Sequence, residues 1–224
     1  QAILLTLFVI SGCSKPEPFD HGAGSVLRAD SEINEIVAEN FVIEKLYGGF
    51  QFTEGPVWIS RNGGYLLFSD IPANAIYKWT PDGEISNFLK PVFEGDYEEG
   101  SYVGSNGLLL DPEGNLVLCE HGGRRISRIN EDGERTTVIE RYKGKRLNSP
   151  NDAVFRSDGS LYFTDPPYGL AQQDGDPNKE LAFNGIFLFT VDGKLTLLNG
   201  DQTRPNGIGL SPNEEKLYVA NSDP

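Results

Sequence analysis

Short apolar runs alternate with turn residues along most of this chain. Gly, Pro, Asp and Asn gather between the runs, a pattern typical of short antiparallel strands joined by tight turns. One arrangement occurs four times: a lead segment, a turn and a second strand. The lead segments are Glu54–Trp58, Asn106–Leu110, Asn151–Phe155 and Asn206–Leu210, and the second strands are Tyr65–Ser69, Leu116–Glu120, Leu161–Thr164 and Leu217–Asn221.

The first three of these units continue in the same way. A third strand is followed by a tight turn containing Asp-Gly, which favours a hairpin, and then by a short fourth strand. The predicted third strands are Ala75–Trp79, Arg125–Ile129 and Gly185–Phe189. Four antiparallel strands about every 50 residues are the signature of a β-propeller blade. We therefore predict an all-β fold with blades at residues 50–90, 104–140 and 150–199 and a partial blade at 205–224.

The predicted propeller is incomplete, because three and a half blades cannot close a ring. We expect the parent protein to continue beyond Pro224 and assign residues 36–224 to the incomplete propeller. Phe41–Tyr47 is predicted to be a lone strand ahead of the first blade. In a closed ring this strand would complete the last blade.

The N-terminal residues predict export. The chain contains no Met, so we expect that its natural N-terminus is missing. Gln1–Ile10 is apolar but shorter than the ~20 residues of a membrane-spanning helix, and it fits the apolar region of an export signal. Ile10–Cys13 resembles a bacterial lipobox, in which the cysteine is lipidated; an ordinary signal peptide with a chance cysteine is the alternative. Residues 1–13 are thus a signal segment, residues 14–35 a tether, and the protein is expected in the periplasm or anchored to the outer membrane through Cys13.

Charge and cysteine content exclude two classes of protein. The formal net charge of −14 makes a nucleic-acid backbone an unfavourable partner, and the membrane is expected to be contacted only through the lipid anchor. Cys119 is the only cysteine besides Cys13, so no framework of intrachain disulfides is indicated. A solvated acidic surface explains most of the carboxylates.

The geometry of a blade brings the first residues of the lead segments together. The start of the first strand and the end of the second lie at the same end of an antiparallel sheet, and radial repetition turns these ends toward one mouth of the channel. Glu54, Asn106, Asn151 and Asn206 should therefore converge. The same face should carry the ends of the second strands and the longest insertion, a candidate lid; these are Asp70–Pro72, Glu120–Gly122, Asp165–Tyr168 and Gly169–Phe183.

One carboxylate and several amide oxygens around an axis predict a site for one divalent metal ion. Such hard ligands favour Ca²⁺ over Zn²⁺, with Mn²⁺ and Mg²⁺ as further alternatives. An Asn before Gly is first of all a turn residue, so a turn or the pocket wall explains Asn106 better than ligation does. Convergence favours ligation for Asn151 and Asn206, and Glu54 has no role in a turn.

Four stretches resemble the senescence marker protein/gluconolactonase/luciferin-regenerating family. They are FTEGPVW, SNGLLLDPEGNLVLCEHGGRRISRI, LNSPNDAVFRSDGSLYFTDPPYG and RPNGIGLSPNEEKLYVANS, and they are similar to bacterial gluconolactonases in particular. The resemblance covers the chain from about Phe50 to its end. It implies a six-bladed propeller with one divalent metal in the channel mouth and the hydrolysis of sugar lactones.

The resemblance also implies roles for individual residues. Glu54, Asn151 and Asn206 match metal-site positions of the family, and the pocket wall is matched by Asn106, His121 and Arg124. The remaining ligand of the family, an Asp that heads the fifth blade, has no counterpart in these residues. We therefore expect these 224 residues alone to be inactive, although the function of a parent protein is unaffected.

The expected chemistry is attack on the lactone carbonyl by metal-activated water. Within this chain Glu54 and Asp152 are the candidate catalytic carboxylates, and Arg124 either binds sugar hydroxyls or forms surface charge with Arg125. A serine nucleophile is disfavoured, because the chain has no Gly-x-Ser-x-Gly motif. Two alternatives stay open: an esterase or phosphotriesterase on the same scaffold, and a propeller without catalysis that binds a sugar or a protein.

Overall fold

A computed structural model describes residues 24–97 and 101–223 of the chain. The chain divides into two units, which meet between Gly48 and Gly49. The predicted signal segment and Cys13 lie outside the described residues. Within the described ranges, no helix has the length and apolar character needed to cross a bilayer.

The described part of the N-terminal unit contains one helical turn, α1 (Ile33–Ile36). The backbone N–H of Val37 donates to the carbonyl of Ile33 and closes this turn at 2.8 Å. The guanidinium of Arg28 donates to the carbonyls of Val37 (2.8 Å) and Ala38 (2.6 Å), which follow the turn. A single arginine therefore bonds to two carbonyl groups just beyond the end of the helix.

The lone strand predicted at Phe41–Tyr47 is wrong. Residues 41–50 contain no strand, although part of the stretch alternates apolar and polar residues. A strand is stabilised by ladder hydrogen bonds to a partner strand, and in the described residues no sheet includes this segment.

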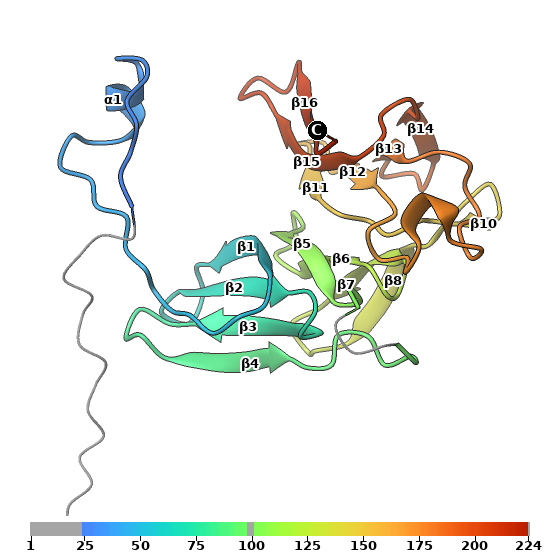
Figure 1. Ribbon diagram of the computed structural model, residues 1–224, viewed down its shortest axis with the longest axis horizontal. Coiled ribbons are helices and arrows are strands. Elements are labelled where there is room, and N and C mark those ends of the chain that lie inside the picture. The colour runs from blue at the N-terminus through green and yellow to red at the C-terminus, as the bar shows by residue number, and fades with distance from the viewer. Residues whose placement is uncertain (1–23, 98–100, 224) are drawn as a thin grey trace, which may run out of the picture. The chain divides into compact units, whose positions relative to one another are not determined.

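The second unit consists of antiparallel sheets whose neighbouring strands follow one another in sequence, as the repeat predicts (Figure 1). The first two sheets have four strands each. The first contains β1 (Thr53–Ile59), β2 (Tyr65–Asp70), β3 (Ala75–Trp79) and β4 (Ile85–Leu89), and the second contains β5 (Ser105–Leu110), β6 (Leu116–Glu120), β7 (Arg125–Ile129) and β8 (Arg135–Ile139).

A third four-stranded sheet and a two-stranded sheet follow, after a small hairpin. The hairpin is β9 (Arg141–Tyr142) with β10 (Lys145–Arg146), the third sheet contains β11 (Ala153–Phe155), β12 (Leu161–Asp165), β13 (Gly185–Phe189) and β14 (Leu195–Asn199), and the last contains β15 (Pro205–Leu210) and β16 (Leu217–Asn221). The three predicted third strands begin and end at the predicted residues. The predicted all-β propeller architecture is confirmed, and these sheets are its blades.

Each inner blade buries both of its faces, and β6 shows how. Leu116 and Leu118 belong to an apolar cluster shared with the first blade. Val117 and Cys119 point to the opposite face and belong to a cluster shared with the third blade. Because successive side chains of a strand alternate between faces, a strand between two neighbouring blades can be apolar at successive positions, as Leu116–Cys119 are. Cys119 is accordingly a small core residue, as the sequence predicts.

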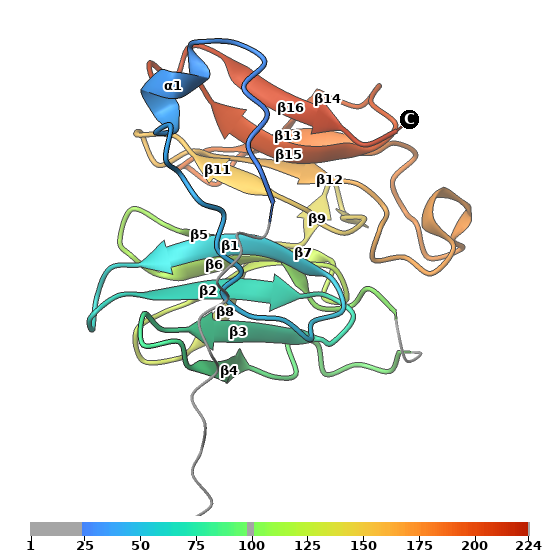
Figure 2. The same ribbon diagram turned by 60° about the vertical axis from the view of Figure 1, so that its left-hand side comes forward.

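The first strands of successive blades lie next to one another. β5 contacts β1 and β2 of the first blade, β11 contacts β5, and β15 contacts β11 and β12. Figure 2 shows the same succession from β1 to β15 in the second view. The lead residues at the starts of these strands are therefore close neighbours.

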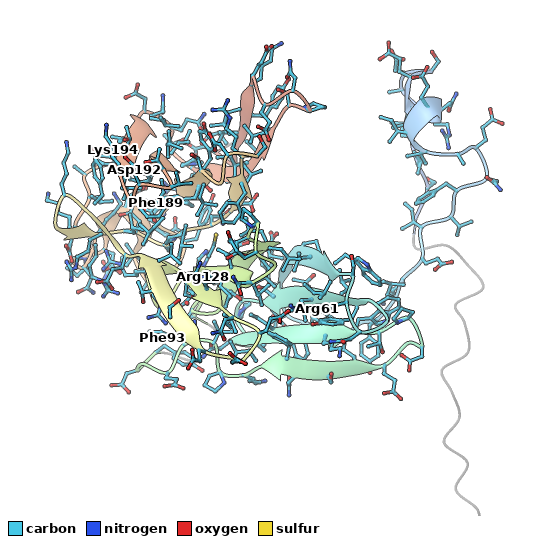
Figure 3. All side chains as sticks on the ribbon, turned by 180° about the vertical axis from the view of Figure 1, so that it is seen from behind. Arg61, Phe93, Arg128, Phe189, Asp192 and Lys194 are labelled. Carbon is cyan, nitrogen blue, oxygen red and sulfur yellow. The ribbon has the colours of Figure 1, made fainter. Side chains whose placement is uncertain are left out.

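The turns at the other end of the blades are tied by polar pairs. Arg61, labelled in Figure 3, lies in the turn between β1 and β2. It pairs with Glu131, between β7 and β8, at 2.5 Å. Glu214, between β15 and β16, accepts from the N–H (2.8 Å) and the hydroxyl (2.6 Å) of Ser157 in the third blade. Exposed pairs of this kind contribute little to stability, so apolar packing between blades is the main stabilising contact.

Candidate active site

One cavity of about 320 Å³ opens where the starts of the first strands meet. All four lead residues line it, together with residues from the second-strand ends and from the long insertion. Its wall consists of Phe52, Glu54, Ile71, Tyr102, Asn106, His121, Asn151, Tyr168, Gln173 and Asn206. The convergence that the blade geometry predicts is therefore present, and the roles of these residues in ligation or binding stay predictions.

Local irregularities of the first strands turn the lead residues toward the cavity. The ladder between the first and second strands loses its register at the lead residue in three blades, between Glu54 and Val57, between Ser105 and Leu108, and between Pro205 and Ile208. A β-bulge of this kind redirects a side chain and is common beside active sites. Asn106 and Asn206 accordingly lie inside strands rather than in turns, which removes the turn as the reason for either residue.

The backbone just before the lead residue is braced from the second strand in three of the four blades. In each case the side chain of the last residue of the second strand accepts hydrogen bonds from backbone N–H groups. These groups belong to residues two or three positions before the lead residue in the sequence. The pairs are Asp70 with Gln51 (3.0 Å) and Phe52 (3.1 Å), Asp165 with Asn148 (2.8 Å), and Asn221 with Arg204 (2.7 Å). These polar side chains hold the cavity wall in place.

The second blade departs from this scheme. Its second strand ends at Glu120, which is 1% exposed and pairs with Arg125 (3.0 Å) and Arg135 (2.5 Å). Glu120 also accepts a short hydrogen bond from Ser127. The carboxylate is thus satisfied within its own blade, and Arg135 continues to the carbonyl of Val92 at 2.6 Å, after the first blade.

Hydroxyl groups fix two lead residues from the neighbouring blade. The Oγ of Ser69 in β2 donates to the carbonyl of Asn106 at 2.9 Å, and the Oγ1 of Thr164 in β12 donates to the carbonyl of Asn206 at 2.7 Å. Both hydroxyls stand one residue before the end of the second strand. Cys119 has this position in the second blade, and there the N–H of Gly107 donates to the carbonyl of Asn151 at 2.8 Å.

The glycine after a lead residue is required by the approach of the next blade. A Cβ on Gly107 would lie 2.9 Å from the carbonyl oxygen of Asn151, and one on Gly55 would lie 2.1 Å from that of Asn106. Gly55 also has φ +57°, a conformation that disfavours other residues. The sequence suggested a turn or the pocket wall for Asn106 before Gly107, but contact between blades explains this glycine.

Asp152 takes the glycine position in the third blade and joins that blade to the fourth. Its Oδ1 accepts from the N–H of Ala153 (2.9 Å), and its Oδ2 accepts from the N–H of Ile208 (3.1 Å). Burial raises the pKa of Asp152, and these two N–H groups oppose the shift. Asp152 is absent from the cavity wall, so its contacts are those of a bridging residue.

The amide groups in the cavity wall are poor in protein partners. Asn106 and Asn151 are 7% and 2% exposed, and their side chains make no hydrogen bond to the described residues. The Nδ2 of Asn206 donates to the Oγ of Ser222 at 2.8 Å, which leaves its Oδ1 as an acceptor. The amide N and O atoms of Asn106 and Asn151 are accessible from the cavity, where a polar ligand, an ion or water can bond to them.

Glu54 experiences an unfavourable environment for a negative charge. Burial and the nearby charge of Asp152 raise its pKa, and the N–H of Gly55 opposes this shift. Among residues 24–97 and 101–223, no three His, Cys, Asp or Glu side chains gather as a metal-binding cluster. A cation would have to be held by Glu54 together with amide oxygens, a donor set that fits a hard ion.

His121 is a buried, neutral side chain in the cavity wall. Burial lowers the pKa of its imidazole to about 4, and the backbone of Tyr102 opposes this shift only weakly. Neither ring nitrogen makes a hydrogen bond of good geometry to the described residues. At neutral pH the ring therefore offers one donor and one acceptor to a ligand.

Arg124 lies outside the cavity wall, unlike the other predicted pocket residues. Its Nε donates to the carbonyls of Leu147 (2.8 Å) and Asn148 (3.1 Å), and its Nη1 donates to the carbonyl of Asn178 (2.8 Å). These contacts tie the second blade to the start of the third blade and to the insertion. The observed position of Arg124 is therefore that of a brace, and it is 6% exposed rather than part of a charged surface.

Two wall residues, Phe52 and Tyr102, were missed by sequence reasoning, and Gln173 was not singled out within the insertion that the sequence placed on this face. The rings of Phe52 and Tyr102 meet at 5.8 Å in a T-shaped contact, and Gln173 comes from the insertion. Phe52 stands two residues before Glu54 on the braced segment, which is the signal that could have found it. Tyr102 and Gln173 lie in loops, whose paths the repeat does not specify.

Comparison with known proteins places this fold and cavity in a family. The model of the SMP-30/Gluconolactonase/LRE-like region matches residues 52–224. The gluconolactonase of Zymomonas mobilis subsp. mobilis is 43% identical over 207 residues, which are 89% of this chain and 57% of that protein. The diisopropyl-fluorophosphatase of Loligo vulgaris is 24% identical over 163 residues, 70% of this chain and 51% of that protein.

The solved structure of a gluconolactonase from Xanthomonas campestris superimposes with a TM-score of 0.68 at 34% sequence identity. The match covers 80% of this chain and 57% of that chain. This chain thus spans less than two thirds of the length of these relatives. The matched region contains all four blades and every residue of the cavity wall, and the chain belongs to the SMP-30/gluconolactonase/LRE-like family.

Proposed function

We propose that the cavity is part of the active site of a metal-dependent hydrolase that opens sugar lactones. One observation carries the proposal: Glu54, Asn151 and Asn206 bring a carboxylate and two amides into one cavity, where the side chains of Asn106 and Asn151 make no hydrogen bond to the described residues. Family membership and the 43% identical gluconolactonase support the substrate class.

The donor set fits a hard divalent cation. We assign Glu54, Asn151 and Asn206 as its ligands in this chain, with Ca²⁺ as the favoured ion and Zn²⁺, Mn²⁺ or Mg²⁺ as alternatives. The raised pKa of Glu54, caused by burial and by Asp152, is the environment that a bound cation would reverse. When bound, the ion would supply Lewis-acid polarisation of the lactone carbonyl and a lowered pKa of water.

The remaining wall residues bind and orient the lactone. His121 is neutral above pH about 4 and offers a hydrogen bond to a substrate oxygen. The amide of Asn106 offers a donor and an acceptor to sugar hydroxyls. Phe52 and Tyr102 form an apolar part of the wall that excludes water and packs against the carbon-bound faces of a sugar ring.

The two candidate carboxylates, Glu54 and Asp152, are not equally placed to accept a proton. Both carboxylate oxygens of Asp152 accept hydrogen bonds from backbone N–H groups, and the residue does not line the cavity. Glu54 does line it, so its carboxylate can reach a proton of water in the cavity. Within the described residues we therefore prefer Glu54 to Asp152 as the proton acceptor, in addition to its part in holding the ion.

A phosphotriesterase is the second candidate, because the diisopropyl-fluorophosphatase of Loligo vulgaris is 24% identical. A polarised centre attacked by activated water is common to both reactions, so the ligand set does not separate them. The cavity favours the lactone, since its buried amides and imidazole suit a substrate with several hydroxyl groups.

The test uses the full-length gene product and follows proton release from glucono-δ-lactone, with phenyl acetate and a phosphotriester for comparison. We expect Ca²⁺-dependent hydrolysis of the lactone that is abolished by EDTA. Glu54→Gln should lower Ca²⁺ affinity in calorimetry and hydrolysis together, while the far-UV spectrum stays native. Glu84→Gln, at an exposed position, is the matched control. Hydrolysis that survives saturating EDTA would contradict the metal-dependent mechanism.

A further inference from the structure

The segment between β12 and β13 contributes Tyr168 and Gln173 to the cavity wall, and Gln173 comes from the long insertion at Gly169–Phe183. This insertion contains a short 3₁₀ turn, η1 (Gln173–Gly175). The backbone of Gln173 has φ +48°, the left-handed conformation that residues other than glycine, Asn and Asp seldom adopt. Strained residues of this kind persist where surrounding contacts hold them, and they cluster at ligand sites.

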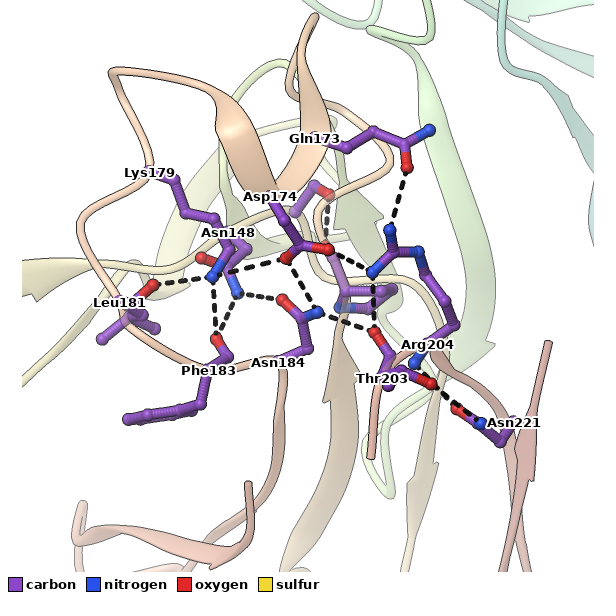
Figure 4. A network of polar contacts seen from close by, with 12 residues as sticks. Asn148, Gln173, Asp174, Lys179, Leu181, Phe183, Asn184, Thr203, Arg204 and Asn221 are labelled. Carbon is purple, nitrogen blue, oxygen red and sulfur yellow. Dashed lines mark hydrogen bonds and ion pairs between the residues drawn. The ribbon is translucent and has the colours of Figure 1, made fainter. Parts of the chain in front are cut away.

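The adjacent residue supplies those contacts (Figure 4). The carboxylate of Asp174 accepts from Asn184 at 3.0 Å and from Arg204 in a short ion pair, and it lies 3.6 Å from the ammonium of Lys179. Burial acts to raise the pKa of Asp174, but the hydrogen bonds from Asn184 and Arg204 prevail and lower it. The ion pair with Arg204 therefore holds the insertion against the segment that begins the fourth blade.

The same arginine orients Gln173. The Nη2 of Arg204 donates to the Oε1 of Gln173 at 3.3 Å. A guanidinium is only a donor, so the carbonyl end of the Gln173 amide must face Arg204. The Nε2 amino group makes no hydrogen bond to the described residues, and in Figure 4 it points away from Arg204. Two N–H donors are therefore available at the exposed rim of the cavity.

Arg204, which contacts Asp174 and Gln173, is also held next to the lead residue of the fourth blade. Its backbone N–H donates to the Oδ1 of Asn221 at 2.7 Å, the brace that precedes Asn206 by two residues. The side chain of Arg204 thus starts from a fixed backbone and holds Asp174 and Gln173 together. The position of Gln173 relative to Asn206 is set by these contacts.

We propose that Gln173 is a specificity-determining residue of the lactone site, whose Nε2 donates a hydrogen bond to a hydroxyl oxygen of a polyhydroxylated lactone. This proposal rests on the proposed function. The ligand supplies an acceptor oxygen, because the free end of Gln173 is only a donor.

The kinetic test compares glucono-δ-lactone with δ-valerolactone, which has the same reacting ring but no hydroxyls. Gln173→Ala should raise KM for glucono-δ-lactone by about fivefold, the effect of one lost hydrogen bond, with kcat within about twofold. For δ-valerolactone both constants should be unchanged. Gln172→Ala is the matched control, since the Gln172 side chain is exposed and absent from the wall.

A binding experiment tests the role of Gln173 separately from the proposed function. The lactam analogues of the two lactones keep the ring and are not hydrolysed, so their affinities are measured by calorimetry even if the wild type is inactive. Gln173→Ala should weaken the hydroxylated lactam by about fivefold and leave the other lactam unchanged. Absence of lactone hydrolysis with this pattern intact overturns the proposed function and supports the role of Gln173.

Two outcomes overturn the role of Gln173. One is unchanged affinity of Gln173→Ala for the hydroxylated ligand, and the other is an equal loss for both ligands, which would be a general structural effect. The positioning role of Arg204 has its own readout: Arg204→Leu should reproduce the selective increase in KM, and the double variant should be no worse than Gln173→Ala alone. Additive losses contradict action through Gln173.

Discussion

The Oγ1 hydroxyl of Thr164 donates to the backbone carbonyl of Asn206 at 2.7 Å, across the boundary between the third and fourth blades. Thr164 is fully buried, and Asn206 is one of the residues that line the cavity. The equivalent hydroxyl of Ser69 donates to the carbonyl of Asn106, the lead residue of the second blade. The position of a cavity residue is therefore set from the blade before it.

Thr164→Val tests this relationship. Valine has nearly the same shape, so the main loss is the hydrogen bonds of the hydroxyl: the one to the carbonyl of Asn206 and the longer one that it accepts from the N–H of Asp152 at 3.3 Å. We expect the free energy of unfolding to fall by about 1–3 kcal/mol. Ca²⁺ affinity, measured by calorimetry, should fall by roughly 10-fold, as is typical when a group that orients a ligand is removed. Thr164→Ser keeps the hydroxyl and should retain wild-type affinity; an equal loss in both variants would contradict the explanation.

Gly107→Ala tests the close approach of the blades. The added Cβ would lie 2.9 Å from the Oδ1 of Asp152 and 2.9 Å from the carbonyl of Asn151, both on the neighbouring blade. We expect a loss of stability of about 1–3 kcal/mol in chemical denaturation, because neither group can move without disturbing the blade contact. Gly209→Ala, in a first strand with no neighbour within 4 Å, should be close to neutral. A neutral Gly107→Ala would show that the blades are less closely packed.

The raised pKa of Asp165 leads us to expect that the free energy of unfolding depends on pH. Burial raises its pKa from 3.8 to about 7, while the N–H groups of Asn148 and Ser149 oppose the shift. The folded state therefore holds a proton that the unfolded state releases, and this contribution, complete below pH 3.8, is lost as the pH rises through 7. Asp165→Asn should gain stability relative to wild type across this range, by about 1.4 kcal/mol per pH unit. A difference that is constant with pH would contradict the shift.

His121 contributes with the opposite sign and provides the control. Its folded pKa of about 4 lies below the ordinary 6.5, so its contribution is present above pH 6.5 and is lost as the pH falls through 4. His121→Gln should therefore remove the rise that this residue contributes between these values and leave the opposing fall in stability that Asp165 causes. The wild-type profile is expected to be flatter than that of either variant, because the two residues compensate.

Cys13→Ala tests the proposed lipid anchor. Cys13 lies outside the described residues, and the lipobox resemblance of Ile10–Cys13 is the basis of the proposal that the protein is exported and anchored at a membrane. We expect the variant to move from the membrane fraction to the soluble fraction, or to accumulate unprocessed, after fractionation of bacteria producing the full-length protein. Unchanged membrane association would count against lipidation.

The sequence by itself determined the blades. Turn residues occur at regular intervals, so strands such as Arg125–Ile129 could be predicted to the residue. The convergence of Glu54, Asn106, Asn151 and Asn206 could also be predicted, because equivalent ends of repeated sheets must face the same side. Both follow from local chemistry and repetition alone.

Only the tertiary structure decided what individual residues in the motifs do. Arg124 donates hydrogen bonds to three carbonyls, and Asp152 links two blades. Gly107 allows the next blade to approach closely. Each of these contacts joins residues that are far apart in sequence. Phe41–Tyr47 forms no strand, because the alternation of side chains does not by itself supply a partner. Gln173 reached the cavity through Arg204, 31 residues later, and no local pattern encodes that distance.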